Sequence, residues 1–130
     1  RTVHLTLDIP DQLLATAVPG AAEQIIDNYL ANALDVAPDH SIVCITARAT
    51  SPHTAELRIT DRGPGIPPNL IANAFDRFWR SPSSAHGGTG LGLSIVARLA
   101  HASGGTAELR NAPTGGLDAI ARLPVARQEP

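Results

Sequence analysis

The 130-residue sequence is poor in cysteine, methionine and aromatic residues, and it carries little excess charge. Its single cysteine, Cys44, excludes a disulfide framework and a cysteine-clustered zinc site within the chain. Its apolar runs are all shorter than the ~18 residues that a membrane-spanning helix needs. A net charge of -2 provides no basic field of the kind that binds nucleic acid.

The composition that remains is that of a globular protein, with 43% hydrophobic and 17% charged residues. Single domains usually contain ~100–150 residues, and a chain of this size buries enough surface to fold without metals or disulfides. We therefore predict one domain over residues 1–130. Because the chain begins at Arg1 and contains no methionine, we expect this domain to be a fragment of a larger protein.

Hydrophobic periodicity predicts the secondary structure. Alternation of apolar and polar residues predicts strands with one buried face, and apolar residues at helical spacing predict amphipathic helices. The predicted strands cover residues 3–9, 43–49, 55–60, 106–110 and 117–123, and the segment 13–18 could add another. The predicted helices cover residues 21–37, 69–78 and 91–101. This order predicts an α+β, two-layer fold, in which helices cover one face of a mixed, mostly antiparallel sheet.

Polar side chains follow one face of the first long predicted helix, where Gln24, Asn28, Asn32 and Asp35 recur at steps of four, four and three. A stripe of this kind is often only a solvated surface. Asparagine, however, costs up to roughly 0.7 kcal/mol relative to alanine in a helix, and solvated stripes more usually hold Glu or Lys. The two asparagines therefore suggest amide oxygens that bind a ligand such as Mg²⁺. Both interpretations remain open at this point.

A carboxylate and two glycines follow the third predicted strand, in the run Asp61-Arg62-Gly63-Pro64-Gly65. Glycine lets the backbone approach a flat ligand closely or turn with positive φ. A buried carboxylate at this corner could accept hydrogen bonds from an exocyclic amine. An ordinary turn after a strand would use the same residue types, so the run is not decisive alone.

A glycine-rich run, Gly87–Leu93, leads directly into the third predicted helix. Backbone N–H groups at a helix start, together with the positive end of the helix dipole, bind phosphate oxygens. The run matches neither the dinucleotide-binding fingerprint nor the P-loop. A flexible linker is the alternative, but a linker would not normally continue into an amphipathic helix. We therefore favour phosphate binding, and we expect residues 81–90 to be mobile.

Three of the four aromatic residues lie close together, at Phe75, Phe78 and Trp79. We expect Phe75 and Phe78, three positions apart, to share a core face. Arg77 and Arg80 can bind phosphate as bidentate donors, and they flank the glycine-rich segment as a lid over anionic phosphates would require.

In this order the four motifs resemble the ATP-binding catalytic domain of bacterial sensor histidine kinases, which belongs to the GHKL or Bergerat superfamily. The resemblance extends over nearly the whole chain. The motifs correspond to the N box, the first glycine box, the F box and the second glycine box: Asn28–Ala33, Asp61–Ile66, Phe75–Arg80 and Gly88–Leu93.

The resemblance implies a role for each motif residue. Asn32 would bind the Mg²⁺ that bridges the phosphates, with Asn28 beside it. Asp61 would accept a hydrogen bond from the adenine amino group, and Arg77 or Arg80 would contact phosphate. The remaining nucleotide-binding residues implied by the two glycine boxes are Gly63, Gly65, Ile66, Gly88, Thr89, Gly90, Leu91 and Gly92.

The reaction implied is transfer of the γ-phosphoryl group of ATP to a histidine, with ATP and Mg²⁺ bound by this domain. The acceptor histidine would belong to a separate dimerisation domain of the same protein, and a response regulator would act through the full-length kinase. The chain has five histidines, His4, His40, His53, His86 and His101. None of them has the surroundings of the family's acceptor histidine, which lies on a helix with an acidic neighbour and a nearby Thr-Pro. The resemblance also implies a cytoplasmic domain, without membrane or nucleic-acid contact, of a parent anchored in the bacterial inner membrane.

Two features depart from the family pattern. Asp35 and Val36 occupy positions where a basic residue and an aromatic residue or histidine are common, and a carboxylate near a triphosphate is repulsive. Ala21 replaces a frequent helix-capping aspartate. Three alternatives therefore stay open: a nucleotide-sensing or docking module without transfer activity, a serine kinase of the anti-sigma-factor type, and an ATPase. The last is disfavoured because Asn28 stands where hydrolases of the superfamily carry a glutamate base.

Overall fold

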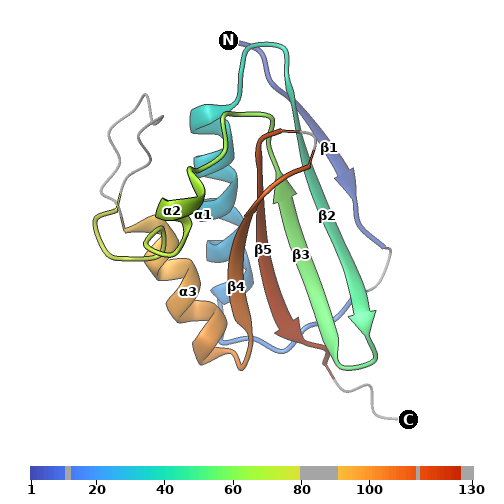
Figure 1. The fold of residues 1–130 in the computed structure, drawn as a ribbon. Helices are drawn as coiled ribbons and strands as arrows, with labels where there is room; N and C mark the ends of the chain where they lie inside the picture. The colour runs from blue at the N-terminus through green and yellow to red at the C-terminus, as the bar shows by residue number, and fades with distance from the viewer. Residues whose placement is uncertain (11–12, 80–90, 114, 127–130) are drawn as a thin grey trace.

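The computed structural model describes residues 1–10, 13–79, 91–113 and 115–126, and within these ranges it contains five strands and three helices (Figure 1). The strands are β1 (His4–Asp8), β2 (Ile42–Ser51), β3 (Thr54–Thr60), β4 (Thr106–Asn111) and β5 (Leu117–Pro124). The helices are α1 (Ala21–Val36), α2 (Pro68–Ile71) and α3 (Gly92–Ala102).

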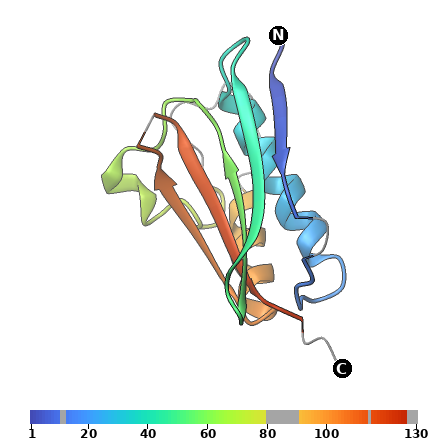
Figure 2. The same ribbon diagram turned by 90° about the vertical axis from the view of Figure 1, so that its right-hand side faces the viewer.

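The strands form one mixed sheet in the order β1-β2-β3-β5-β4. β1 is parallel to β2, whereas every other neighbouring pair is antiparallel. The long helices α1 and α3 pack together on one face of this sheet, and no helix of the described ranges covers the other face (Figures 1 and 2). This arrangement confirms the predicted α+β, two-layer fold. None of the described helices has the length and apolar character needed to cross a membrane.

The hydrophobic core lies between the helices and the sheet. It is built from the apolar faces that the periodicity predicted, including Ile25 of α1, Val96 of α3 and Ile59 of β3, each no more than 1% exposed. Tyr29 is also buried, and its hydroxyl donates a 2.8 Å hydrogen bond to the carbonyl oxygen of Ile120. Burial raises the pKa of Tyr29, so the hydroxyl keeps its proton and remains a donor. This bond joins α1 to β5, an interior strand of the sheet.

The opposite face of the sheet carries a ladder of ion pairs. Arg58 contacts Glu56 at 3.0 Å and Asp118 at 3.2 Å, and Arg122 contacts Glu56 at 3.4 Å. Ile120, which lies directly opposite Arg58 in the β3–β5 pairing, has no exposed surface. The ladder therefore covers an apolar side chain on a face that no described helix shields, because long arginine stems can pack over apolar surface.

Three local expectations are wrong. β1 has no buried face, since Leu5 and Leu7 are 50% and 68% exposed; this strand lies at the sheet edge, where helix cover is incomplete. The segment 13–18 forms only one isolated bridge, from Ala15 to Val125, and no strand. The helix predicted over 69–78 is the four-residue α2 followed by turns, and the positive φ of Phe78 (67°) cannot continue a helix.

Candidate nucleotide-binding site

The two asparagines of the first helix differ in exposure. Asn32 is exposed on α1, whereas Asn28 is partly buried. The amide nitrogen of Asn28 donates to the Gln24 carbonyl oxygen at 3.0 Å, and its Oδ1 points toward the start of α3. A Cβ placed on Gly92 would lie 3.0 Å from this Oδ1. The N box and the start of the second glycine box therefore meet, and glycine at position 92 permits that close approach.

The carboxyl group of Asp61 lies in a buried corner directly after β3, where the residue is only 3% exposed. Its Oδ1 accepts hydrogen bonds from the backbone nitrogens of Gly63 at 2.8 Å and Leu117 at 3.2 Å. Within the described part of the chain both bonds fall on Oδ1, so Oδ2 can accept from a ligand. Burial raises the pKa of Asp61, an effect that the two backbone bonds partly offset and the charge of Asp118 reinforces.

The first glycine box also packs against the end of α1. A Cβ on Gly63 would lie 2.8 Å from the Cγ2 atom and 3.0 Å from the carbonyl oxygen of Val36. Glycine is thus required at position 63 by the helix behind it. Val36, a departure from the family pattern, is here a packing partner of the loop, and it links the loop to the same helix that carries Asn28 and Asn32.

Two residues of the β4–β5 hairpin, Asn111 at the end of β4 and Gly116 in the turn, support the same loop. Asn111 accepts from the Ile66 backbone nitrogen at 2.8 Å and donates to the Ile66 carbonyl oxygen at 2.7 Å. Gly116, with φ 88°, packs so closely on the Asp61 carbonyl that a side chain there would collide with it. Neither residue could be identified from the sequence, because residues 111–116 have an ordinary turn composition. They also lie 45 positions or more from the loop that they contact.

The F box divides between the core and the surface. Phe75 and Trp79 are partly buried against the core cluster, whereas Phe78 is 64% exposed. The expected core face of Phe75 and Phe78 is therefore wrong for Phe78, because the left-handed backbone at that residue turns its side chain outward. The Arg77 guanidinium lies 5.4 Å from the centroid of the Phe78 ring, within cation–π range.

Several predicted site residues fall outside the described ranges. Arg80, Gly88, Thr89 and Gly90 belong to this group, as do His86 and the predicted mobility of residues 81–90. Of the second glycine box, Leu91, Gly92 and Leu93 are described. The Leu91 carbonyl accepts from the Ile95 backbone nitrogen at 2.9 Å and from the Ser94 hydroxyl at 2.8 Å, which defines the first turn of α3.

The donor set suits Mg²⁺ better than a softer metal. The described residues hold no cluster of three or more His, Cys, Asp or Glu side chains that could bind an ion by themselves. Mg²⁺ commonly keeps several waters and takes only one or two protein oxygens together with substrate phosphates. The exposed amide of Asn32 fits that requirement, and it would act together with a bound triphosphate.

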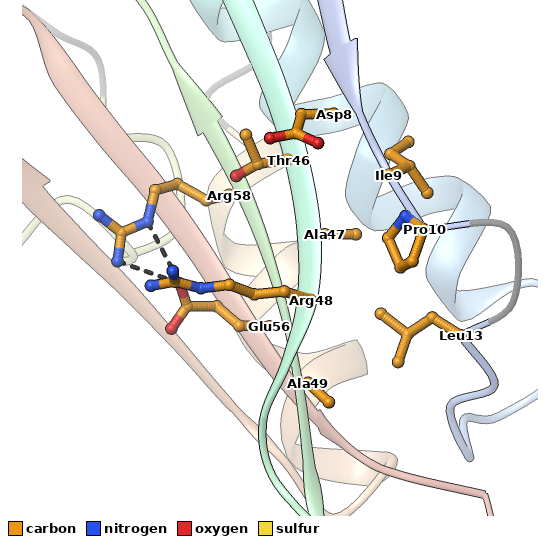
Figure 3. Close-up of a pocket in the computed structure, with 10 residues that line it drawn as sticks. All are labelled: Asp8, Ile9, Pro10, Leu13, Thr46, Ala47, Arg48, Ala49, Glu56 and Arg58. Atoms are coloured by element: carbon orange, nitrogen blue, oxygen red, sulfur yellow. Dashed lines mark hydrogen bonds and ion pairs between the residues drawn. The ribbon is translucent and has the colours of Figure 1, made fainter.

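A hollow of about 630 Å³ lies apart from these motifs, where β1 ends beside β2 (Figure 3). Its charged lining includes Glu56 and Arg58, which already bind each other in the ion-pair ladder. None of the motif residues that the structure describes lines it. Its described lining residues are Asp8, Ile9, Pro10, Leu13, Thr46, Ala47, Arg48, Ala49, Glu56 and Arg58.

Comparison with known proteins identifies the class of protein. Residues 17–127 match the family described as histidine kinase-, DNA gyrase B-, and HSP90-like ATPase, and the chain belongs to this family. Sensor protein QseC of Salmonella typhi is 36% identical over 120 residues, which are 92% of this chain and 25% of QseC. Sensor protein CreC of Escherichia coli strain K12 is 33% identical over 123 residues, or 94% of this chain and 25% of CreC.

The fold of the chain agrees with solved structures of sensor histidine kinases. The mycobacterial sensor histidine kinase MprB superposes with a TM-score of 0.84 at 29% identity, covering 97% of this chain and 86% of that one. The ATP-binding domain of PrrB from Mycobacterium tuberculosis gives a TM-score of 0.74 at 29% identity, with 96% and 82% covered. The resemblance to the ATP-binding catalytic part of sensor histidine kinases is confirmed. The chain spans about a quarter of the length of the curated relatives QseC and CreC, 25% in each case.

Proposed function

We propose that the chain binds Mg-ATP and donates the γ-phosphoryl group to a histidine on a separate dimerisation domain of a two-component sensor kinase. The observation that carries this proposal is the buried Asp61 corner, whose Oδ2 is available to a ligand while Oδ1 is held by two backbone N–H groups. A full-length ShkA histidine kinase that superposes with a TM-score of 0.83 at 27% identity was solved with AMPPNP. That precedent supports a nucleotide as the ligand.

The adenine end of the nucleotide would be bound by the first glycine box. Asp61 Oδ2 accepts a hydrogen bond from the exocyclic amine, which orients the base. Gly63 and Gly65 let the loop pack tightly against Val36 and Asn111, and Gly65 has the positive φ (73°) that favours glycine. Ile66, buried to 6% exposure, supplies an apolar contact beside the loop.

The phosphate end would be bound between α1 and α3. Mg²⁺, when bound, neutralises phosphate charge, and Asn32 would hold it with Asn28 alongside. The positive end of the α3 helix dipole lies at Leu91 and Gly92, and it favours the binding of anions such as phosphate there. Arg77, on the exposed surface of the F box, supplies a cationic donor. Arg80, Gly88, Thr89 and Gly90 would complete this set, as the family pattern implies.

Phosphoryl transfer requires positioning and charge neutralisation more than covalent chemistry from the protein. The bond between the γ-phosphorus and the β–γ bridging oxygen breaks, a phosphorus–nitrogen bond forms to the acceptor imidazole, and ADP leaves. The imidazole proton passes to a base on the acceptor domain or to water. Asn28 cannot take up a proton, so activation of water for sustained hydrolysis is disfavoured.

The proposed partners follow from this reaction. The acceptor domain belongs to the same protein, and a response regulator receives the phosphoryl group from it. We place residues 1–130 as a single catalytic domain, on the cytoplasmic side of a parent that is anchored in the bacterial inner membrane.

The isolated chain is expected to bind Mg-ATP without becoming phosphorylated. After incubation with γ-labelled ATP and Mg²⁺, calorimetry should detect binding while gel autoradiography shows no label on the chain. An acid-labile, base-stable label on the chain would contradict the assignment of the acceptor to another domain. Transfer of an acid-stable label to a serine-bearing protein would instead support the anti-sigma-factor type of serine kinase.

A second candidate function, a nucleotide-sensing or docking module without transfer activity, is favoured by Asp35. This carboxylate lies on the α1 face that carries Asn28 and Asn32, where it repels phosphate. Asp35→Lys should therefore tighten Mg-ATP binding by about tenfold in calorimetry. The matched control is Asp27→Lys at an exposed α1 position, which should change affinity much less. Binding by Asp35→Lys but not by the wild-type chain would support the module without transfer activity.

A further inference from the structure

We propose that Asn111, at the end of β4, is the positioning residue that holds the adenine-binding loop in the conformation that selects an amino-substituted purine. This inference rests on the proposed function and deepens it. Asn111 would touch no part of the nucleotide. It would act through the main chain of Ile66, to which its side chain is bound at both the N–H and the carbonyl group.

The two hydrogen bonds need an amide. Oδ1 accepts from the Ile66 nitrogen at 2.8 Å, and Nδ2 donates to the Ile66 oxygen at 2.7 Å. A side chain with only acceptors or only donors makes one of these bonds at most. In the described structure Ile66 lies outside every strand. The two hydrogen bonds from Asn111 therefore take the place of those that a neighbouring strand would make to the Ile66 N–H and carbonyl groups. They fix the backbone of Ile66 in a segment with no regular secondary structure.

The adenine-binding loop is held at both ends by the β4–β5 hairpin. At its start, the Asp61 nitrogen donates to the Leu117 oxygen at 3.0 Å, and the Leu117 nitrogen donates back to Asp61 Oδ1 at 3.2 Å. At its end, Asn111 binds Ile66. Between these anchors, Gly65 lies so close to the Asn111 side chain and to the Gly116 carbonyl that a Cβ at position 65 has no space.

This construction determines selectivity because Asp61 can recognise the amine only if the base enters at a fixed height and angle. Gly63 packs against Val36 and Gly65 packs against Asn111, so Asn111 sets the position of the far end of the loop relative to Asp61. Release of Ile66 leaves the Asp61 carboxyl in place, held by Leu117, but frees the far end of the loop. The expected loss is thus in discrimination between bases more than in folding.

The test compares Asn111→Ala with the wild-type chain in two assays. In the nucleotide-free chain, amide hydrogen exchange at Ile66 should become faster by about tenfold or more, because both bonds to its peptide groups are lost. In calorimetry with Mg²⁺, the preference for ATP over inosine triphosphate, which lacks the exocyclic amine, should fall by about tenfold. A uniform loss of stability would weaken both nucleotides equally and leave their ratio unchanged.

Two further variants keep the result interpretable. Asn111→Asp has nearly the same shape and keeps the acceptor for the Ile66 N–H, but when ionised it cannot donate to the Ile66 carbonyl oxygen and repels it. The preference for ATP over inosine triphosphate should therefore fall in this variant even if Asn111→Ala folds poorly, whereas amide exchange at Ile66 should rise less than in Asn111→Ala. Asn69→Ala, at an exposed position in α2, is the matched control and should change neither readout.

The possible outcomes separate this inference from the proposed function. Unchanged Ile66 exchange, or faster exchange with an unchanged ratio of ATP to inosine triphosphate affinity, would overturn the role of Asn111 alone. A wild-type chain that binds neither nucleotide would overturn the proposed function and this inference with it, whereas one that binds both equally would overturn the adenine selectivity, and with it this inference, while leaving Mg-ATP binding in place.

Discussion

Replacement of Asp61 by asparagine is expected to weaken Mg-ATP binding by about 100-fold while leaving the chain folded. Asparagine keeps Oδ1, which accepts both structural hydrogen bonds, from Gly63 and Leu117. Its amino group then occupies the place of Oδ2 and presents a donor to the adenine amine, which is also a donor. Inosine triphosphate carries an acceptor oxygen at that position, so Asp61→Asn should prefer it over ATP. Calorimetry with both nucleotides measures this inversion.

The stability of the same variant has a predictable pH dependence. Because burial raises the pKa of Asp61 in the folded chain above its ordinary value of 3.8, the folded state binds the proton more tightly than the unfolded state. The contribution of Asp61 to stability therefore declines as pH rises from 3.8 through the raised folded-state pKa. Asparagine does not ionise, so urea unfolding should find the variant gaining stability relative to wild type over that interval.

Asp27→Asn is the matched control for this experiment. Asp27 is exposed on α1, and its replacement removes the same charge from the chain without touching the corner. The preference between the two nucleotides should not change. If Asp61→Asn bound ATP as tightly as wild type, the carboxylate would not be the adenine acceptor, and the site would have to be sought elsewhere.

Gly116→Ala is expected to have the largest effect on stability, with a loss of at least ~3 kcal/mol in the free energy of unfolding. Gly116 has φ 88°, where a Cβ costs energy in any surroundings, and its Cβ would also collide with the carbonyl group of Asp61. The clash is with the backbone carbonyl of Asp61, the residue after β3. A side-chain rotation therefore cannot relieve it. Chemical denaturation measures the change, and nucleotide binding should be lost with it.

The neighbouring glycine separates the two causes. Gly115 also has positive φ (94°), but a Cβ there meets nothing within 4 Å. Gly115→Ala should therefore show the conformational cost alone, about 1 kcal/mol. Equal losses for the two variants would mean that the contact with Asp61 carries no energetic weight.

The main elements and the motif positions could be predicted because they depend on local patterns. The apolar stripe on α1 and the alternation in β2 and β3 recur at fixed spacing, and Tyr29, Val43 and Ile59 are buried where that spacing indicated, whereas Ala49 near the end of β2 is exposed. The alternation in β1 is equally regular, yet Leu5 and Leu7 remain half or more exposed, at 50% and 68%. Periodicity tells which side chains share a face, but it does not tell whether anything covers that face.

The supports of the site could not be predicted, because they join distant segments. Nothing around Asn111 distinguishes it from other turn asparagines, and its partner Ile66 lies 45 residues earlier. The exposure of Phe78 was missed for a related reason, since a left-handed residue inside an apparently helical run leaves no trace in the apolar pattern. The ordered set of boxes was specific enough to identify the family without these details.

The two ends of the proposed nucleotide would be bound by different parts of the fold. The base corner rests on the sheet, at the ends of β3 and β5, whereas the metal and phosphate groups would rest on α1 and the start of α3. Asn28 of α1 and Gly92 of α3 meet closely at this phosphate end. Under the proposed function, substitutions at Asn32 or at the start of α3 would change phosphate binding while leaving the Asp61 corner, which is held by Leu117 of β5, in place.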